Sequence, residues 1–134
     1  MSTSAHTVLY RPVGQKEFEL VRDSGFTRFP PRLPEQPIFY PVATEEYAVT
    51  IARDWNASAP GETGYVIGFR IEAAFLDRYE PHKVGGAQHL EYWIPAEDLD
   101  DFNDHIVGAM EVLHVFHGRD RDEQDVPGHG RPFG

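Results

Sequence analysis

The stretch IFYPVATEEYAVTIARDW, residues 38–55, decides the fold, because a short strand pattern leads directly into an amphipathic helix pattern. Residues 38–40 are apolar and typical of a β-strand, which Pro41 closes. Thr44 is a good N-cap, and the two glutamates after it lie where the helix dipole favours acids. We expect the helix to continue to about Trp55. Its apolar side consists of Tyr47, Ala48, Ile51, Ala52 and Trp55.

Strand and helix patterns continue on both sides of this stretch. The strand patterns cover 7–11, 38–40, 65–71, 89–94 and 110–116. The helix patterns cover 14–24, 44–55, 73–79 and 95–103. A loop with four prolines, residues 26–37, follows the first helix and should be stiff. The later connections are short, so we predict an α+β fold with a mixed sheet rather than repeated parallel units.

The length of 134 residues fits a single domain, which we place at residues 1–116. Residues 117–134 are rich in Gly, Pro, Arg and Asp, which predicts a flexible tail. The chain has no cysteine, which excludes disulfides, zinc–thiolate sites and cysteine catalysis.

The acidic composition limits the classes of partner. The net charge is -10, so phosphate backbones and anionic membranes repel the chain, and nonspecific nucleic-acid binding is not expected. No apolar run reaches the roughly 18 residues of a membrane helix, and the first residues lack a signal-peptide pattern. We therefore expect a cytoplasmic protein with no membrane partner.

Several common catalytic motifs are missing. The chain contains no Rossmann glycine fingerprint after a strand, no P-loop, no nucleophile elbow and no H-E-x-x-H. His114 and His117 are three residues apart on a predicted strand, where their side chains would point to opposite faces. We therefore predict no metal site.

Three features have residue types suited to binding or catalysis. Tyr10-Arg11 ends the first predicted strand, where an arginine binds phosphate or carboxylate through two hydrogen bonds. The alternative is a surface arginine covering the strand end.

The second feature is Phe39-Tyr40, with Thr44 after it, which offers an aromatic ring for stacking. We assign Phe39 to the core and expect Tyr40 to face the other side of the sheet.

Glu91 is the third feature, because it lies within a strand pattern and is flanked by aromatic residues. A buried carboxylate there needs a hydrogen-bond partner or a raised pKa, both of which mark functional acids. The alternative is a solvent-facing strand position. His89 and Trp93 share the predicted strand face of Glu91.

The order of an arginine, an aromatic and a late glutamate resembles the layout of the ADP-ribosyltransferase fold. More closely, LYRPVG (9–14), FPPRLPEQPIFYPV (29–42) and EYWIPAE (91–97) resemble a family of small bacterial proteins labelled "ADP-ribosylation/crystallin J1". The resemblance covers about residues 8–113. It implies a bent, split sheet with short flanking helices and NAD in the cleft.

The resemblance also implies roles for single residues. Arg11, with Tyr10 beside it, would hold a ribose or phosphate of NAD. Tyr40, with Thr44 nearby, would stack on the nicotinamide. Glu91 would hydrogen-bond the nicotinamide ribose and act as the catalytic carboxylate. His89 stands where many transferases have a Glu or Gln that orients the acceptor, so we assign it to substrate binding.

Three functional hypotheses follow. The first is an NAD-dependent ADP-ribosyltransferase or related NAD-consuming enzyme. The second is a catalytically silent domain of the same fold that binds a ligand or protein. The third is an interaction module that uses the proline-rich loop 30–37, and it predicts no cleft around Arg11, Tyr40 and Glu91.

Overall fold

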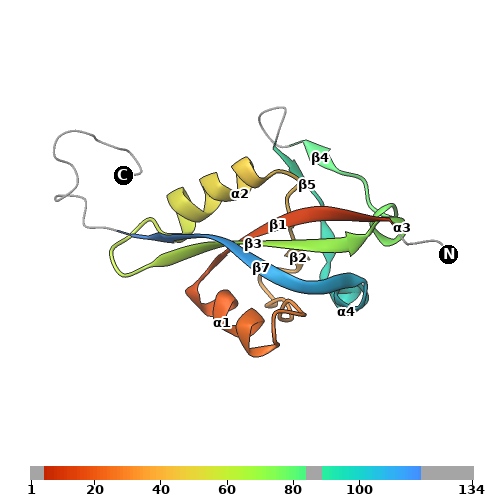
Figure 1. Ribbon diagram of the computed structural model, residues 1–134, viewed down its shortest axis with the longest axis horizontal. Helices are drawn as coiled ribbons and strands as arrows, with labels where there is room; N and C mark the ends of the chain where they lie inside the picture. Colours follow the sequence, from red (N-terminus) through yellow and green to blue (C-terminus); the bar gives the residue numbers. More distant parts are fainter. Residues whose placement is uncertain (1–4, 84–88, 119–134) are drawn as a thin grey trace.

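The computed structural model describes residues 5–83 and 89–118, and it confirms an α+β fold with several small sheets and short helices (Figure 1). The strands are β1 (His6–Gly14), β2 (Ile38–Phe39), β3 (Thr63–Glu72), β4 (His82–Lys83), β5 (Leu90–Glu91), β6 (Ile94–Pro95) and β7 (Ile106–His117). The helices are α1 (Gln15–Asp23), α2 (Glu45–Ile51), α3 (Ala73–Leu76) and α4 (Leu99–Asp104). A π-helical turn, Ala52–Asn56, extends α2, and a 3-10 turn, Ala96–Asp98, precedes α4.

The main sheet has the order β1-β3-β7, and every pairing between described strands is antiparallel. The prediction of a mixed sheet is therefore wrong. Gly14 at the end of β1 pairs with Gly64 near the start of β3, so the chain re-enters the sheet at the end where it left. A parallel neighbour would require the intervening chain to cross back to the other end of the sheet.

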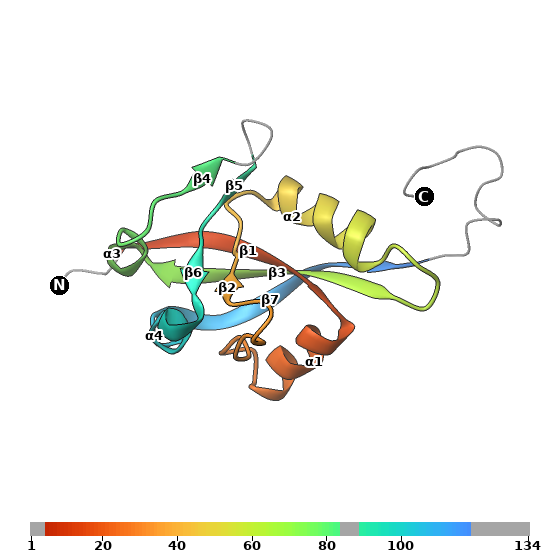
Figure 2. The same ribbon diagram turned by 180° about the vertical axis from the view of Figure 1, so that it is seen from behind.

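One short segment, residues 38–43, links the main sheet to the smaller ladders. The backbone N–H of Val42 donates to the Tyr10 carbonyl at 2.8 Å, and Tyr10 returns the bond at 2.9 Å. On its other side Val42 pairs with Glu91. Figure 2 shows the chain of β2 and β6 running across the long strands. Three stretches far apart in sequence, around Arg11, Tyr40 and Glu91, are thus brought side by side.

The predicted strand 89–94 forms two shorter strands instead of one. Its first part, β5, pairs with β4, and its last part, β6, pairs with β2. Two different partners hold the two ends, so the ladder is interrupted at Tyr92 and Trp93. The strand 7–11 also proves longer than predicted. Pro12 lies inside β1, where its missing N–H is tolerated next to the sheet edge.

The core is a cluster of interlocking aromatic rings. Phe102 makes edge contacts with Phe39, Phe69 and Phe75 at centroid distances of 5.5–6.0 Å. Phe39 is fully buried, as predicted. A second, smaller cluster packs α2 against the sheet. Its buried members are Val42, Ala48, Ala52 and Val66.

The helix predicted at 44–55 keeps α-helical geometry only to Ile51. The wider π-helical turn then rotates the chain, and the Trp55 side chain is left 68% exposed. Its assignment to the buried face is therefore wrong.

At the other end of the chain, β7 extends to His117, and the backbone N–H of Gly118 donates to the Glu62 carbonyl. The rest of the predicted tail, residues 119–134, lies outside the described residues. Among the described helices, none has the length and apolarity of a membrane span.

Candidate functional site

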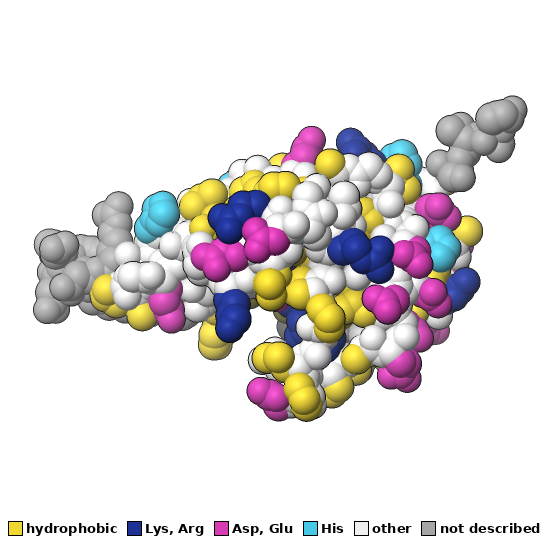
Figure 3. All heavy atoms as spheres, turned by 90° about the horizontal axis from the view of Figure 1, so that it is seen from below, with side chains coloured by type: hydrophobic (Ala, Val, Ile, Leu, Met, Phe, Trp, Pro, Cys, Tyr) yellow, Lys and Arg dark blue, Asp and Glu magenta, His cyan; other side chains and the backbone are white. Residues whose placement is uncertain are grey.

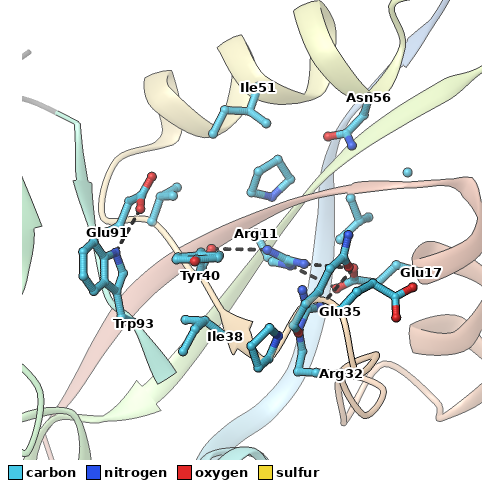
Figure 4. Close-up of a pocket in the computed structure, with 16 residues that line it drawn as sticks. Arg11, Glu17, Arg32, Glu35, Ile38, Tyr40, Ile51, Asn56, Glu91 and Trp93 are labelled. Carbon is cyan, nitrogen blue, oxygen red and sulfur yellow. Dashed lines mark hydrogen bonds and ion pairs between the residues drawn. The ribbon is translucent and has the colours of Figure 1, made fainter. Parts of the chain in front are cut away.

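A cleft of about 730 Å³ runs between β1, the segment 38–42, the segment 91–93 and α2 (Figure 4). It contains Arg11, Tyr40 and Glu91, one candidate from each of the three features. The lining also includes Gly14, Glu17, Arg32, Glu35, Ile51, Asn56 and Trp93. The cleft contradicts the third hypothesis, which required none around these residues. Figure 3 shows one face of the molecule deeply hollowed, with basic side-chain atoms visible inside the hollow.

Glu91 is held at one end of the cleft by two neutral donors. The Tyr47 hydroxyl donates to its Oε2 atom at 2.7 Å, and Trp93 Nε1 donates to its Oε1 atom at 3.1 Å. Glu91 is half-buried, which lies between the buried position and the solvent-facing position weighed from the sequence. A carboxylate fixed through both oxygens keeps its charge in one place, which suits it to stabilise a positive charge beside it.

Aromatic side chains stand beside this carboxylate. Tyr40 and Trp93 meet edge to face at 6.3 Å and are 41% and 43% exposed. His82 stacks on Trp93 at a centroid distance of 3.7 Å. Tyr40 thus faces away from the core, as predicted. Two large exposed rings next to a fixed carboxylate form a surface on which a flat ligand ring can stack.

Arg11 lies in the middle of the cleft and is 12% exposed. Its Nε and Nη2 atoms donate to the two Glu17 carboxylate oxygens at 3.0 and 2.9 Å, and Nη1 donates to the Tyr40 carbonyl at 3.3 Å. The guanidinium also lies over the Phe39 ring, 4.8 Å from its centroid. The alternative of an ordinary surface arginine is therefore wrong.

Three further candidates do not line this cleft. Tyr10 is next to Arg11 on β1, and successive strand residues point to opposite faces, so it lines a separate hollow with Val8 and Leu113. Thr44 caps α2, with its hydroxyl accepting from the Tyr47 N–H at 3.3 Å. His89 stacks on Tyr47 at 4.3 Å and lines a different hollow. Tyr10 and Thr44, which were assigned to NAD binding, and His89, which was assigned to substrate binding, are thus not among the residues that line the cleft.

Other residues that line the cleft or hold Glu91 were not singled out from the sequence. Tyr47 was assigned only to the apolar face of a helix. Its hydroxyl group was the one feature in the sequence that could have indicated a hydrogen bond to another residue. Trp93 alternates with Glu91 in the sequence, and this period-two pattern could have predicted that the two side chains lie together. Glu17 and Arg32 carried no signal, because their roles depend on how α1 and the proline-rich loop pack against β1.

The histidines near the end of β7 have different partners. His114 Nε2 lies 2.7 Å from Glu45 Oε2, and His117 Nδ1 lies 3.4 Å from the Thr63 hydroxyl. Within residues 5–83 and 89–118, no group of three or more acidic or histidine side chains is arranged to hold a metal ion.

Two tyrosines have strongly raised pKa values. Burial, followed by the hydrogen bond to Glu91, raises the pKa of Tyr47 to about 12. Burial and the hydrogen bond to Asp98 raise the pKa of Tyr79 likewise to about 12. In each case the neutral hydroxyl is favoured, since ionisation would place a second negative charge beside a carboxylate.

We expect these tyrosines to ionise late in an alkaline titration followed by tyrosinate absorbance. Tyr47→Phe should remove one phenol from the step at about pH 12. The raised folded-state pKa also means that the Tyr47 contribution to stability is complete below about pH 10. That contribution is lost as the pH rises through about 12. An unchanged number of phenols in the step at about pH 12 would contradict the Tyr47 assignment.

No family model, curated protein or solved structure matches this chain. The functional argument therefore rests on the residues of the cleft and on their contacts.

Proposed function

We propose that this protein binds NAD, or a similar nucleotide, in the cleft and breaks the bond between nicotinamide and ribose. The observation that carries the proposal is the position of Glu91. Its carboxylate is fixed by Tyr47 and Trp93 and lies in one cleft with Arg11 and Tyr40.

The cleft is suited to a ligand with an aromatic end and an anionic centre. Its volume of about 730 Å³ lies within the usual range for small-molecule sites. In the proposed complex the nicotinamide stacks against Tyr40 or Trp93, and the phosphates approach Arg11. This order places the nicotinamide ribose next to Glu91.

The proposed reaction breaks the C–N glycosidic bond, and its electron pair goes to the pyridinium nitrogen, which leaves as neutral nicotinamide. Positive charge develops on the ribose carbon and ring oxygen, and the Glu91 carboxylate stabilises it. An acceptor then bonds to the ribose carbon and loses a proton. Water is the acceptor in the simplest assay.

The test is release of nicotinamide from NAD by the purified protein, compared with Glu91→Gln. Release by the wild type alone would support the proposal. Absence of release, with protein, small-molecule and nucleic-acid acceptors also supplied, would contradict it.

Arg11→Ala is expected to weaken NAD binding about tenfold, because a charge-assisted bond contributes about 1.5–3 kcal/mol. Titration calorimetry with NAD measures the effect. Arg28→Ala is the matched control, since Arg28 is an exposed arginine that pairs with Asp104 outside the cleft. Equal NAD affinity of wild type and Arg11→Ala would rule out this role.

A second candidate function, ligand binding without turnover, is favoured by the position of His89. This residue was assigned to substrate binding, but it lines a different hollow from the one that Glu91 lines. NAD binding without nicotinamide release, under every acceptor condition, would identify this function.

A further inference from the structure

A second arginine lies next to Arg11, although it comes from a different part of the chain. Arg32 belongs to the proline-rich loop, and its side chain is 10% exposed. Its Nε atom donates to the Gln36 carbonyl at 3.2 Å, which fixes the side chain over the cleft. Its guanidinium lies 5.9 Å from the centroid of Phe39, the same ring that lies under Arg11.

Both arginines reach one oxygen of Glu17. The Oε1 atom is 2.9 Å from Arg11 Nη2 and 4.0 Å from Arg32 Nη1. Two guanidinium groups thus share one close carboxylate. Glu35 also lines the cleft, but it is exposed, and its charge is screened by water.

The positive charge at this point is only partly compensated. Burial, followed by repulsion from Arg11, lowers the pKa of Arg32, and Glu17 opposes this only in part. Among the described residues, the terminal nitrogens of Arg32 donate no hydrogen bond. A nearly buried cation with unused donors favours an incoming anion.

We propose that Arg11 and Arg32 form a subsite for the diphosphate group of a nucleotide, and that Glu17 is an internal counter-ion competing with that anion. The subsite deepens the proposed function, on which the choice of a nucleotide rests. Binding of the anion itself requires no bond cleavage. Diphosphate fits better than a single carboxylate, because two guanidinium groups over the same Phe39 ring carry two positive charges close together.

The proposed subsite is tested with inorganic pyrophosphate and calorimetry. Arg32→Gln should weaken pyrophosphate binding at least tenfold, and orthophosphate should bind more weakly than pyrophosphate. Arg28→Gln, which removes an exposed arginine outside the cleft, should leave the affinity unchanged. Equal affinities of wild type and Arg32→Gln would overturn the proposal. Thermal unfolding checks that the variants fold, and Arg32→Lys, with the charge but not the planar fork, should bind with intermediate affinity.

Glu17→Gln tests the competing role. A neutral amide keeps acceptor contact with Arg11 but removes the negative charge, so pyrophosphate should bind several-fold more tightly. Rising salt should weaken pyrophosphate binding in both proteins, because the attraction is electrostatic. Weaker binding by Glu17→Gln would show that Glu17 assists the anion and would overturn its role as a competitor.

The two proposals fail in distinguishable ways. Pyrophosphate binding that depends on Arg32, without nicotinamide release from NAD, keeps the subsite and refutes the enzymatic function. If the protein releases nicotinamide but Arg32→Gln binds pyrophosphate as tightly as the wild type, the enzymatic function stands and the subsite is refuted.

Discussion

Glu91→Gln should lower nicotinamide release by about a hundredfold to a thousandfold, the scale seen when a single group that stabilises developing charge is removed. The carboxylate has no close cationic partner among the described residues; its contacts are the Tyr47 hydroxyl and the Trp93 indole. Its negative charge, at one end of the cleft, is therefore not neutralised by a neighbouring cation. The amide has the same shape without that charge, so the variant isolates the electrostatic contribution.

The fold should survive this substitution, because the amide can satisfy both neighbours. Trp93 Nε1 is only a donor, so the amide oxygen faces it, and the amide nitrogen then faces Tyr47. The Tyr47 hydroxyl reverses its role and accepts. We expect the free energy of unfolding to change by less than about 1 kcal/mol, since each hydrogen bond is replaced.

Glu35→Gln is the matched control, because Glu35 is an exposed carboxylate lining the same cleft. Its rate of nicotinamide release should stay within about threefold of the wild type, as charge at an exposed site is screened. If Glu35→Gln and Glu91→Gln lose nicotinamide release to the same extent, the overall charge of the cleft determines the rate and Glu91 has no specific role. Full activity of Glu91→Gln would refute the proposed chemistry.

The local elements were predictable, since period-two and helical patterns depend on neighbouring residues. The N-cap at Thr44 and the helix at 14–24 both occur as expected. The pairing of strands was not predictable, because it depends on contacts between distant segments. The single bridge residue Val42, which joins Tyr10 to Glu91, has no local signature.

The same distinction applies to the site. Arg11, Tyr40 and Glu91 could be selected because their residue types and strand positions matched a known order. Tyr10 failed because one residue of offset on β1 changes which hollow a side chain enters. His89 failed because it precedes β5 and lies outside the strand that was predicted to hold it. Arg32 needs the whole proline-rich loop to be folded before it meets Glu17.

Gly64→Ala is expected to lower the free energy of unfolding by about 2–3 kcal/mol, in the upper part of the range for overpacking. A Cβ atom at Gly64 would collide with the backbone carbonyl oxygen of Ala52 and would lie 3.0 Å from the Asn56 Cβ. That carbonyl accepts the Ala57 N–H at 3.0 Å and closes the π-helical turn. Backbone cannot swing aside as a side chain does, so the turn itself must move.

Gly68→Ala, in the same strand, separates this collision from the general effect of the substitution. Its Cβ would lie 2.8 Å from Leu113 Cδ1, the end of a flexible and partly exposed side chain that can rotate away. Alanine also removes the entropic penalty of glycine in a strand, about 0.5–1 kcal/mol, so the net change should be small. Urea unfolding of both variants measures the difference.

One outcome is that Gly64→Ala alone is destabilised and also binds NAD more weakly. That outcome would mean that the close approach of β3 to the π-helical turn determines the position of the cleft wall that carries Ile51 and Asn56. Equal stabilities would show that the turn yields at little cost and that the wall does not depend on a glycine at position 64.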